Sequence, residues 1–259
     1  AAVESGMLFA LNELYELGLS RPDLARLAQR SENIFVGMPC GIMDMYASLM
    51  GKADHALQID CRSLTHRYYP FQFPDHALLL CNSGVKHQLV DSEYATRRQQ
   101  CEEGVRLLRE KHPEVRSLRD VTIEMLEVEK SRLSAVVFKR CHYVVKENAR
   151  VLAACQALEA GKLEDFGDLL YQAHRGARDE FEISCPEVDF LVEQARQHPA
   201  VLGSRMMGGG FGGCTINLVE RSGVADFAEQ TARNYKKACG RELPHWEVAL
   251  TDGVTKKGK

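Results

Sequence analysis

The chain has 259 residues, enough for one large domain or two modest ones, and its 45% apolar and 27% charged residues are typical of a globular protein. A formal net charge of −3 argues against binding to nucleic acid or to an anionic membrane surface. No apolar run approaches the length that spans a bilayer, and the first residues lack the layout of a signal peptide.

Helices are predicted first. The apolar residues of segment 1–17 fall on one helical face, and a second helix is predicted to end near Arg30. Ser20 and Asp23 have the spacing of a capping box, and Pro22 suits a first helical turn. A glycine-bounded loop at 37–41 separates this helix from a third over 42–50.

Strands and further helices follow without regular alternation. Alternating β-branched or aromatic residues predict strands over 55–61 and 66–73. A short buried strand is predicted over 77–81, and further strands over 215–220 and 246–251. Helical patterns cover 92–111, 122–132, 134–160, 163–175, 186–198 and 223–238. This mixture favours an α+β fold over a doubly wound sheet, with a domain border near residues 74–76.

Nine cysteines are scattered through the chain, without a CxxC pair or a Cys/His cluster at zinc spacing. Most lie within apolar patterns, where a free cysteine behaves as a small hydrophobic side chain. Their distribution predicts a reducing, cytoplasmic setting.

A glycine cluster at 208–213 is the feature most indicative of a site. It consists of Gly208, Gly209, Gly210, Gly212 and Gly213, interrupted by Phe211. Glycine lets backbone N–H groups approach a ligand closely, although a tight bend before a strand would explain the same residues. The cluster matches neither the Walker motif nor the dinucleotide-binding pattern.

Acidic and basic residues near two loops are further candidates. Glu32 and Asp44 flank the loop at 37–41, and they could divide the tasks of holding Mg²⁺ and activating a hydroxyl. Spacing alone favours the interpretation that they are solvated surface acids. Lys86 and Tyr94 follow a predicted buried strand, where a lysine could contact phosphate or belong to an ordinary polar loop.

Several segments resemble galactokinases, members of the GHMP small-molecule kinase family. The matching strings are GMPCGIMD at 37–44, HALQIDCRS at 55–63, NSGVKH at 82–87, SEY at 92–94, RRQQCE at 97–102, RDEFEISCPE at 178–187 and SRMMGGGFGGC at 204–214. They occur in the family's order and run nearly end to end.

The resemblance implies roles for individual residues. Asp44 stands where the family's catalytic aspartate stands, and Gly41 and Tyr94 match positions that contact galactose. Lys86 matches a basic position near the nucleotide phosphates, and Glu32 has the spacing of the Mg²⁺-binding glutamate. The loop at 208–213 matches the one that packs against the phosphate loop and shapes the sugar site.

The resemblance also implies an architecture and an activity. Residues 1–75 would be the remainder of the GHMP kinase N-terminal domain, carrying the catalytic aspartate segment. Residues 76–259 would be the C-terminal domain, with an antiparallel sheet packed on helices. The implied reaction is ATP- and Mg²⁺-dependent phosphorylation of galactose at its 1-hydroxyl by a monomer. An N-acetylgalactosamine kinase and a sugar sensor without catalysis are the alternatives.

Two family signatures are not found in this sequence. Galactokinases carry a sugar-binding signature and a Gly-Leu-Ser-Ser-Ser-Ala phosphate loop upstream of the helix that segment 1–17 resembles. We therefore expect the chain to begin just after that loop, with Ala1 as its last residue. Whether these 259 residues are active by themselves is left open.

Overall fold

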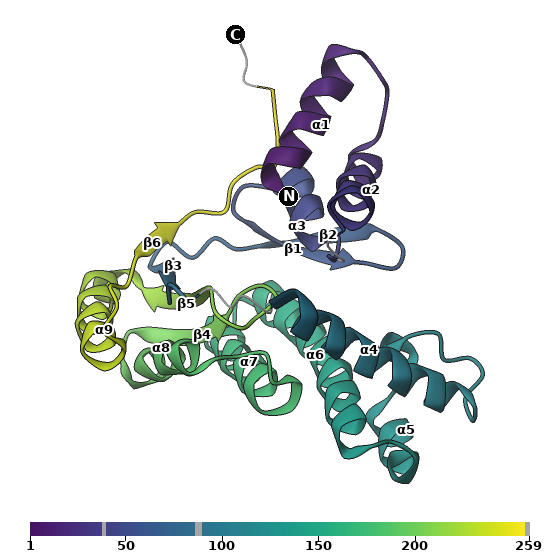
Figure 1. The fold of residues 1–259 in the computed structure, drawn as a ribbon. Helices are drawn as coiled ribbons and strands as arrows, with labels where there is room; N and C mark the ends of the chain where they lie inside the picture. Colours follow the sequence, from purple (N-terminus) through teal and green to yellow (C-terminus); the bar gives the residue numbers. More distant parts are fainter. Residues whose placement is uncertain (38–39, 86–89, 257–259) are drawn as a thin grey trace. The chain divides into compact units, whose positions relative to one another are not determined.

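The computed structural model describes the chain except residues 38–39, 86–89 and 257–259. It divides into two compact units, described separately below and both visible in Figure 1. Unit 1 comprises Ala1–Gln72 and Ala249–Lys259, and unit 2 comprises Phe73–Val248. None of the helices in the described part of the chain has the length and apolar character needed to cross a membrane.

Unit 1 packs helices against a two-stranded antiparallel sheet. Its elements are α1 (Ala2–Leu14), α2 (Arg21–Arg30), the π-helix η1 (Ser31–Val36), α3 (Met43–Met50), β1 (His55–Asp60) and β2 (Thr65–Pro70). The Ser20 hydroxyl caps α2 by accepting the Asp23 N–H at 3.3 Å, as predicted. Leu24, Tyr46 and Leu49 are fully buried in the core that joins α2 to α3.

The C-terminal segment of the chain belongs to unit 1, which sequence reasoning did not predict. The Gly253 N–H donates to Gly51 O at 2.8 Å, and the Arg21 guanidinium donates to Val254 O at 2.8 Å. A Cβ on Gly51 would lie 3.0 Å from Gly253 N, so a glycine permits this close approach. The predicted family-domain border after residue 75 remains a prediction, but the compact units give the C-terminal segment to unit 1 rather than to unit 2.

Unit 2 is an antiparallel sheet covered by helices (Figure 1). Its strand order is β4-β5-β3-β6. The strands are β3 (His76–Asn82), β4 (Val201–Met206), β5 (Cys214–Glu220) and β6 (His245–Val248). The helices are α4 (Val90–Arg109), η2 (Leu118–Asp120), α5 (Ile123–Val128), η3 (Lys130–Arg132), α6 (Ala135–Glu159), α7 (Leu163–Gly176), η4 (Ala177–Phe181), α8 (Pro186–Gln197), η5 (Arg221–Gly223) and α9 (Val224–Cys239).

The expected α+β class and antiparallel sheet are confirmed, and three local predictions are wrong. Strand β4 was not predicted. The helix expected over 122–132 is divided into α5 and η3. The strand expected over 246–251 ends at Val248, because the backbone then leaves the sheet and Leu250 O accepts the Asp54 N–H of unit 1 at 3.2 Å.

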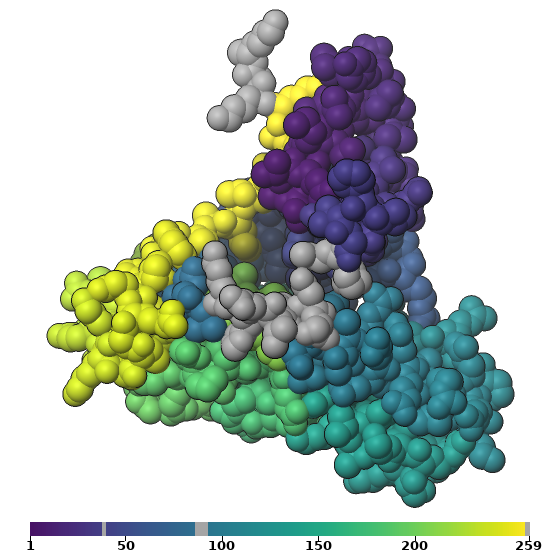
Figure 2. Space-filling view, viewed as in Figure 1, coloured from purple at the N-terminus to yellow at the C-terminus, as the bar shows by residue number. Residues whose placement is uncertain are grey.

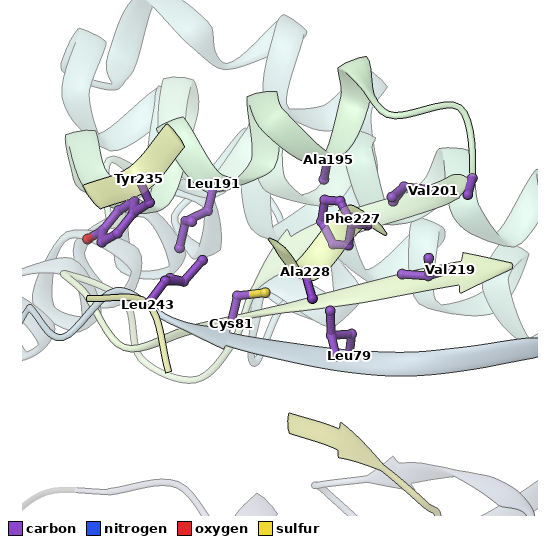
Figure 3. Packing of buried hydrophobic residues seen from close by; sticks show 11 residues of the cluster. Leu79, Cys81, Leu191, Ala195, Val201, Val219, Phe227, Ala228, Tyr235 and Leu243 are labelled. Carbon is purple, nitrogen blue, oxygen red and sulfur yellow. The ribbon is translucent and has the colours of Figure 1, made fainter. Parts of the chain in front are cut away.

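Several apolar clusters of described residues hold unit 2 together. Figure 3 shows one of them, with Ala195 of α8 above the Phe227 ring of α9 and Leu79 of β3 below it. Complete burial of Phe227 stabilises the fold by about 1.5–3 kcal/mol relative to an exposed ring. A second cluster joins α4, α5 and α6 through Leu108, Leu126 and neighbours. α4 and α5 form a continuous blue-to-teal surface in Figure 2.

Candidate functional site

Asp44 lies in the first turn of α3 with its side chain exposed. The neighbouring residues Met45, Tyr46 and Leu49 are buried, so the helix is fixed by one face and presents Asp44 on the other. Within the described chain, no hydrogen bond or ion pair engages the Asp44 carboxylate; its backbone oxygen accepts the Ser48 hydroxyl at 2.7 Å. The carboxylate is therefore free to meet a ligand, and it lies at the helix end where the backbone dipole is positive.

Glu32 and Asp44 are both near enough to Cys40 for their charges to act on its thiol. The backbone N–H of Cys40 donates to Asn33 Oδ1 at 2.8 Å, and its carbonyl accepts Gln29 Nε2 at 3.2 Å. Burial raises the pKa of the Cys40 thiol, and the negative charges of Glu32, Glu4 and Asp44 raise it further. The charges of these carboxylates therefore act on one loop residue, which spacing alone did not establish.

Glu32 also lies beside the start of α1. Its Oε1 atom is 4.0 Å from the Ala1 nitrogen, at the positive end of that helix. Gly41 is exposed at the entry to α3, and a Cβ there would meet no atom within 4 Å. Among the residues that the structure describes, no three His, Cys, Asp or Glu side chains are grouped so that they could hold a metal ion by themselves.

The glycine loop of unit 2 connects β4 to β5 and packs on two other backbone segments. Phe211 N–H donates to Ile183 O at 2.6 Å, and Gly213 O accepts the Ser83 hydroxyl at 2.8 Å. A Cβ on Gly210 would lie 2.2 Å from Ile183 O, and one on Gly212 would lie 2.4 Å from Val85 O. Both glycines have positive φ, of 95° and 136°. Glycine is required here by contact as well as by conformation.

Tyr94 is brought against this loop. It lies on α4 with its side chain 37% exposed, and a Cβ on Gly209 would be 3.9 Å from its ring. One turn further along α4, the Arg97 guanidinium lies 5.8 Å from the centre of the Phe211 ring and donates to Phe181 O at 2.8 Å. Lys86, the remaining predicted site residue, lies outside the described residues.

The predicted residues thus form two sets, Glu32, Gly41 and Asp44 in unit 1 and Tyr94 with the glycine loop in unit 2. Two family models match the chain, the GHMP kinases N terminal domain over residues 1–52 and the GHMP kinases C terminal over 154–238. A curated galactokinase of Thermotoga petrophila is 40% identical over 256 residues, covering 99% of this chain and 71% of the relative. The chain belongs to the galactokinase family of GHMP kinases.

Other relatives of the same name agree with this membership. The galactokinase of Roseiflexus sp. is 42% identical over 98% of the chain, and that of Homo sapiens is 46% identical over 82%. A solved Lactococcus lactis galactokinase, complexed with galactose, has a TM-score of 0.93 and 29% identity over 98% of the chain and 66% of its own. The chain spans 65% of the Roseiflexus relative and 53% of the human one.

A supporting network behind the glycine loop was missed by sequence reasoning. Arg140 of α6 is only 3% exposed, and its guanidinium donates to Glu182 Oε2 at 2.6 Å and to Gln100 Oε1 at 3.1 Å. Glu182 has a positive φ of 56° and ends the π-helix η4. The next residue is Ile183, whose carbonyl receives the Phe211 N–H of the glycine loop. Arg140 therefore fixes the segment on which the loop rests.

This network predicts a dependence of stability on pH. Hydrogen bonds from Arg140 and Lys139 lower the pKa of Glu182 from 4.5 to about 2. A lowered carboxyl pKa contributes stability that is present above 4.5 and is lost as the pH falls toward 2. We expect Glu182→Gln to lower the urea midpoint at pH 7, with a difference from the unchanged protein that narrows steadily below pH 4.5.

The control for this measurement is Glu102→Gln. Glu102 pairs with Arg98 at 2.9 Å, but both side chains are about 60% exposed, and such pairs contribute little. Its midpoint should follow that of the unchanged protein at every pH. A Glu182→Gln difference that stays constant down to pH 3 would contradict the role given to the carboxylate.

Proposed function

We propose that this protein transfers the γ-phosphoryl group of ATP to the 1-hydroxyl of galactose, giving galactose 1-phosphate and ADP. The observation that carries the proposal is the end-to-end likeness to proteins named galactokinase, at 40% identity over 256 residues for the Thermotoga petrophila protein. The likeness to a galactokinase structure complexed with galactose supports the choice of sugar.

In the proposed reaction, Asp44 is the base. The sugar's O1 forms the new bond to the γ-phosphorus, the bond from that phosphorus to the β–γ bridging oxygen of ATP breaks, and the hydroxyl proton passes to the Asp44 carboxylate. The exposed carboxylate, free of hydrogen bonds from the described residues, supports this role. Gly41 and Tyr94 are proposed to contact the sugar, and Lys86 the phosphates.

Glu32 is proposed to supply one carboxylate to Mg²⁺. Magnesium is commonly held by one or two carboxylates together with substrate phosphates and water, so a single glutamate at the start of α1 fits without a group of three protein ligands. The ion would neutralise charge on the phosphates of ATP. The glycine loop would shape the sugar site. Its close packing on Ile183 and Val85 supports this role, because it holds the loop in one conformation.

A reducing, cytoplasmic setting and a monomeric state are also proposed. No disulfide joins the described cysteines, and burial raises the thiol pKa of Cys81 and Cys141 to about 12. Buried, protonated thiols act as small apolar packing groups, which is typical of proteins in a reducing compartment.

The test is sugar-dependent ADP release by the purified protein, with galactose and N-acetylgalactosamine compared side by side. The proposal expects turnover with galactose, and kcat/KM for the N-acetyl sugar at least tenfold lower. Preference for the N-acetyl sugar would instead favour the related kinase. Saturable galactose binding without ADP release would favour a sensor.

A further inference from the structure

A small polar cavity lies between α7 and α8, apart from every residue assigned above. Its volume is about 120 Å³, and side chains of both helices line it. Both helices pack on β4 (Figure 1). Sites for drug-sized ligands usually measure about 300–1,000 Å³, so this cavity suits a small ion rather than a nucleotide.

Two buried donors form its floor. The Tyr171 side chain is 7% exposed, and its hydroxyl has no hydrogen-bond partner among the described residues. Burial raises the pKa of Tyr171 to about 12, so the hydroxyl keeps its proton and can donate. A buried hydroxyl without a partner is costly, which indicates that something outside the chain accepts from it.

His174 supplies the second donor. It is 3% exposed, and its Nδ1 accepts the backbone N–H of Met206 at 3.4 Å. In the neutral ring the proton then resides on Nε2. Nε2 lies 3.2 Å from Asp189 Oδ1, yet the two atoms are not aligned for a hydrogen bond, so this N–H is also left without an acceptor in the described chain.

Arginines surround the two donors. Arg175, Arg178 and Arg196 all line the cavity with exposed side chains. The Arg196 guanidinium lies over the Tyr171 ring, 4.3 Å from its centre, which holds it beside the hydroxyl. Arg178 is paired with Asp179 at 2.7 Å, whereas Arg175 and Arg196 make no hydrogen bond or ion pair with any described residue.

Two carboxylates also line the cavity, and each already has a donor. The Asp189 carboxylate accepts the Ser184 hydroxyl at 2.5 Å, and the Glu193 carboxylate accepts Gln197 Nε2 at 2.8 Å. Together with Asp179, which pairs with Arg178, they balance the formal charge of the three guanidinium groups, but Arg175 and Arg196 keep donors that no described residue accepts. The unsatisfied groups are all donors, and they converge from two helices.

We propose that this cavity is a binding site for a small oxyanion of the size of inorganic phosphate. The anion would accept hydrogen bonds from Tyr171 Oη and His174 Nε2 on the floor, and from the guanidinium groups of Arg175 and Arg196 at the rim. Arginine's planar donors suit phosphate and carboxylate oxygens, which explains a preference for this class of ion over chloride.

The test is a phosphate titration followed on the imidazole ring of His174. Its ¹H–¹⁵N cross-peak, identified by its loss in His174→Gln, reports on this cavity even if phosphate also binds elsewhere. Arg196→Gln should raise the Kd at least tenfold, the usual weight of one charge-assisted contact. Tyr171→Phe keeps the ring beneath Arg196 and should raise the Kd about threefold to tenfold, as for one neutral hydrogen bond.

Arg233→Gln is the matched control, since it makes the same change of charge at an exposed position of α9. Its Kd should stay within twofold of the unchanged protein. A parallel titration with acetate identifies the class of oxyanion, because the ion with the lower Kd is the preferred ligand. A His174 peak that shows no saturable shift with either ion would overturn the proposal, as would equal Kd values for Arg196→Gln and Arg233→Gln; the cavity would then hold water alone.

Discussion

Asp44→Asn should lower kcat by about 10²–10⁴-fold, the contribution of a positioned general base. Asparagine has nearly the same shape as aspartate but cannot take the proton of the sugar hydroxyl. Asp44 is exposed, and its carboxylate supports no described residue, so the free energy of unfolding should change by no more than about 0.5 kcal/mol. Steady-state ADP release and a thermal melt of the same preparation measure both quantities.

Asp165→Asn is the control for this substitution. Asp165 is a 64% exposed acid in the first turn of α7, so it matches Asp44 in residue type, exposure and position in a helix. Its kcat should equal that of the unchanged protein. If Asp44→Asn retained kcat within twofold, Asp44 would not be the base. A loss expressed wholly in KM would assign it to sugar positioning instead.

The long helices of unit 2 were predictable because their apolar periodicity extends over many turns. The pattern over 134–160 corresponds closely to α6, and Ser134 caps this helix by accepting the Val137 N–H at 3.2 Å. Strand β4 was missed because Gly203, Ser204 and Arg205 interrupt any alternation of apolar residues. Gly203 is required because α7 packs closely against it, and such a contact between distant segments leaves no local sequence pattern.

Sequence and structure contribute differently to the candidate site. The ordered strings indicated the family, while spacing alone left Glu32 and Asp44 as ordinary surface acids. The π-helix η1 carries Glu32, whose charge acts on the Cys40 thiol together with that of Asp44. Arg140 could not be found from sequence, because it acts on Glu182, 42 residues away, through a hydrogen-bonded ion pair that only the folded chain brings together.

The contact between α7 and β4 should be highly sensitive to added volume. A Cβ on Gly203 would lie 2.4 Å from Gly167 O and 2.5 Å from Gly167 Cα. The obstructing atoms are backbone, so no change of rotamer relieves the overlap, and helix and strand must separate. Overpacking a rigid core costs about 1–3 kcal/mol and occasionally more. We expect Gly203→Ala to lower the free energy of unfolding by about 3 kcal/mol, measured by urea denaturation.

Gly161→Ala separates this steric effect from the general cost of losing a glycine. Gly161 has a φ of 66° with no atom within 4 Å of a Cβ, so alanine there should cost only about 1–2 kcal/mol for the left-handed conformation. Gly167→Ala offers the sharper test, because its Cβ would lie 2.3 Å from Leu202 O in the same contact. One separation of α7 from β4 relieves both overlaps, so Gly167→Ala combined with Gly203→Ala should cost clearly less than the sum of the single substitutions. Additive costs would show that the two glycines act independently and that the close approach of helix and strand is not what requires them.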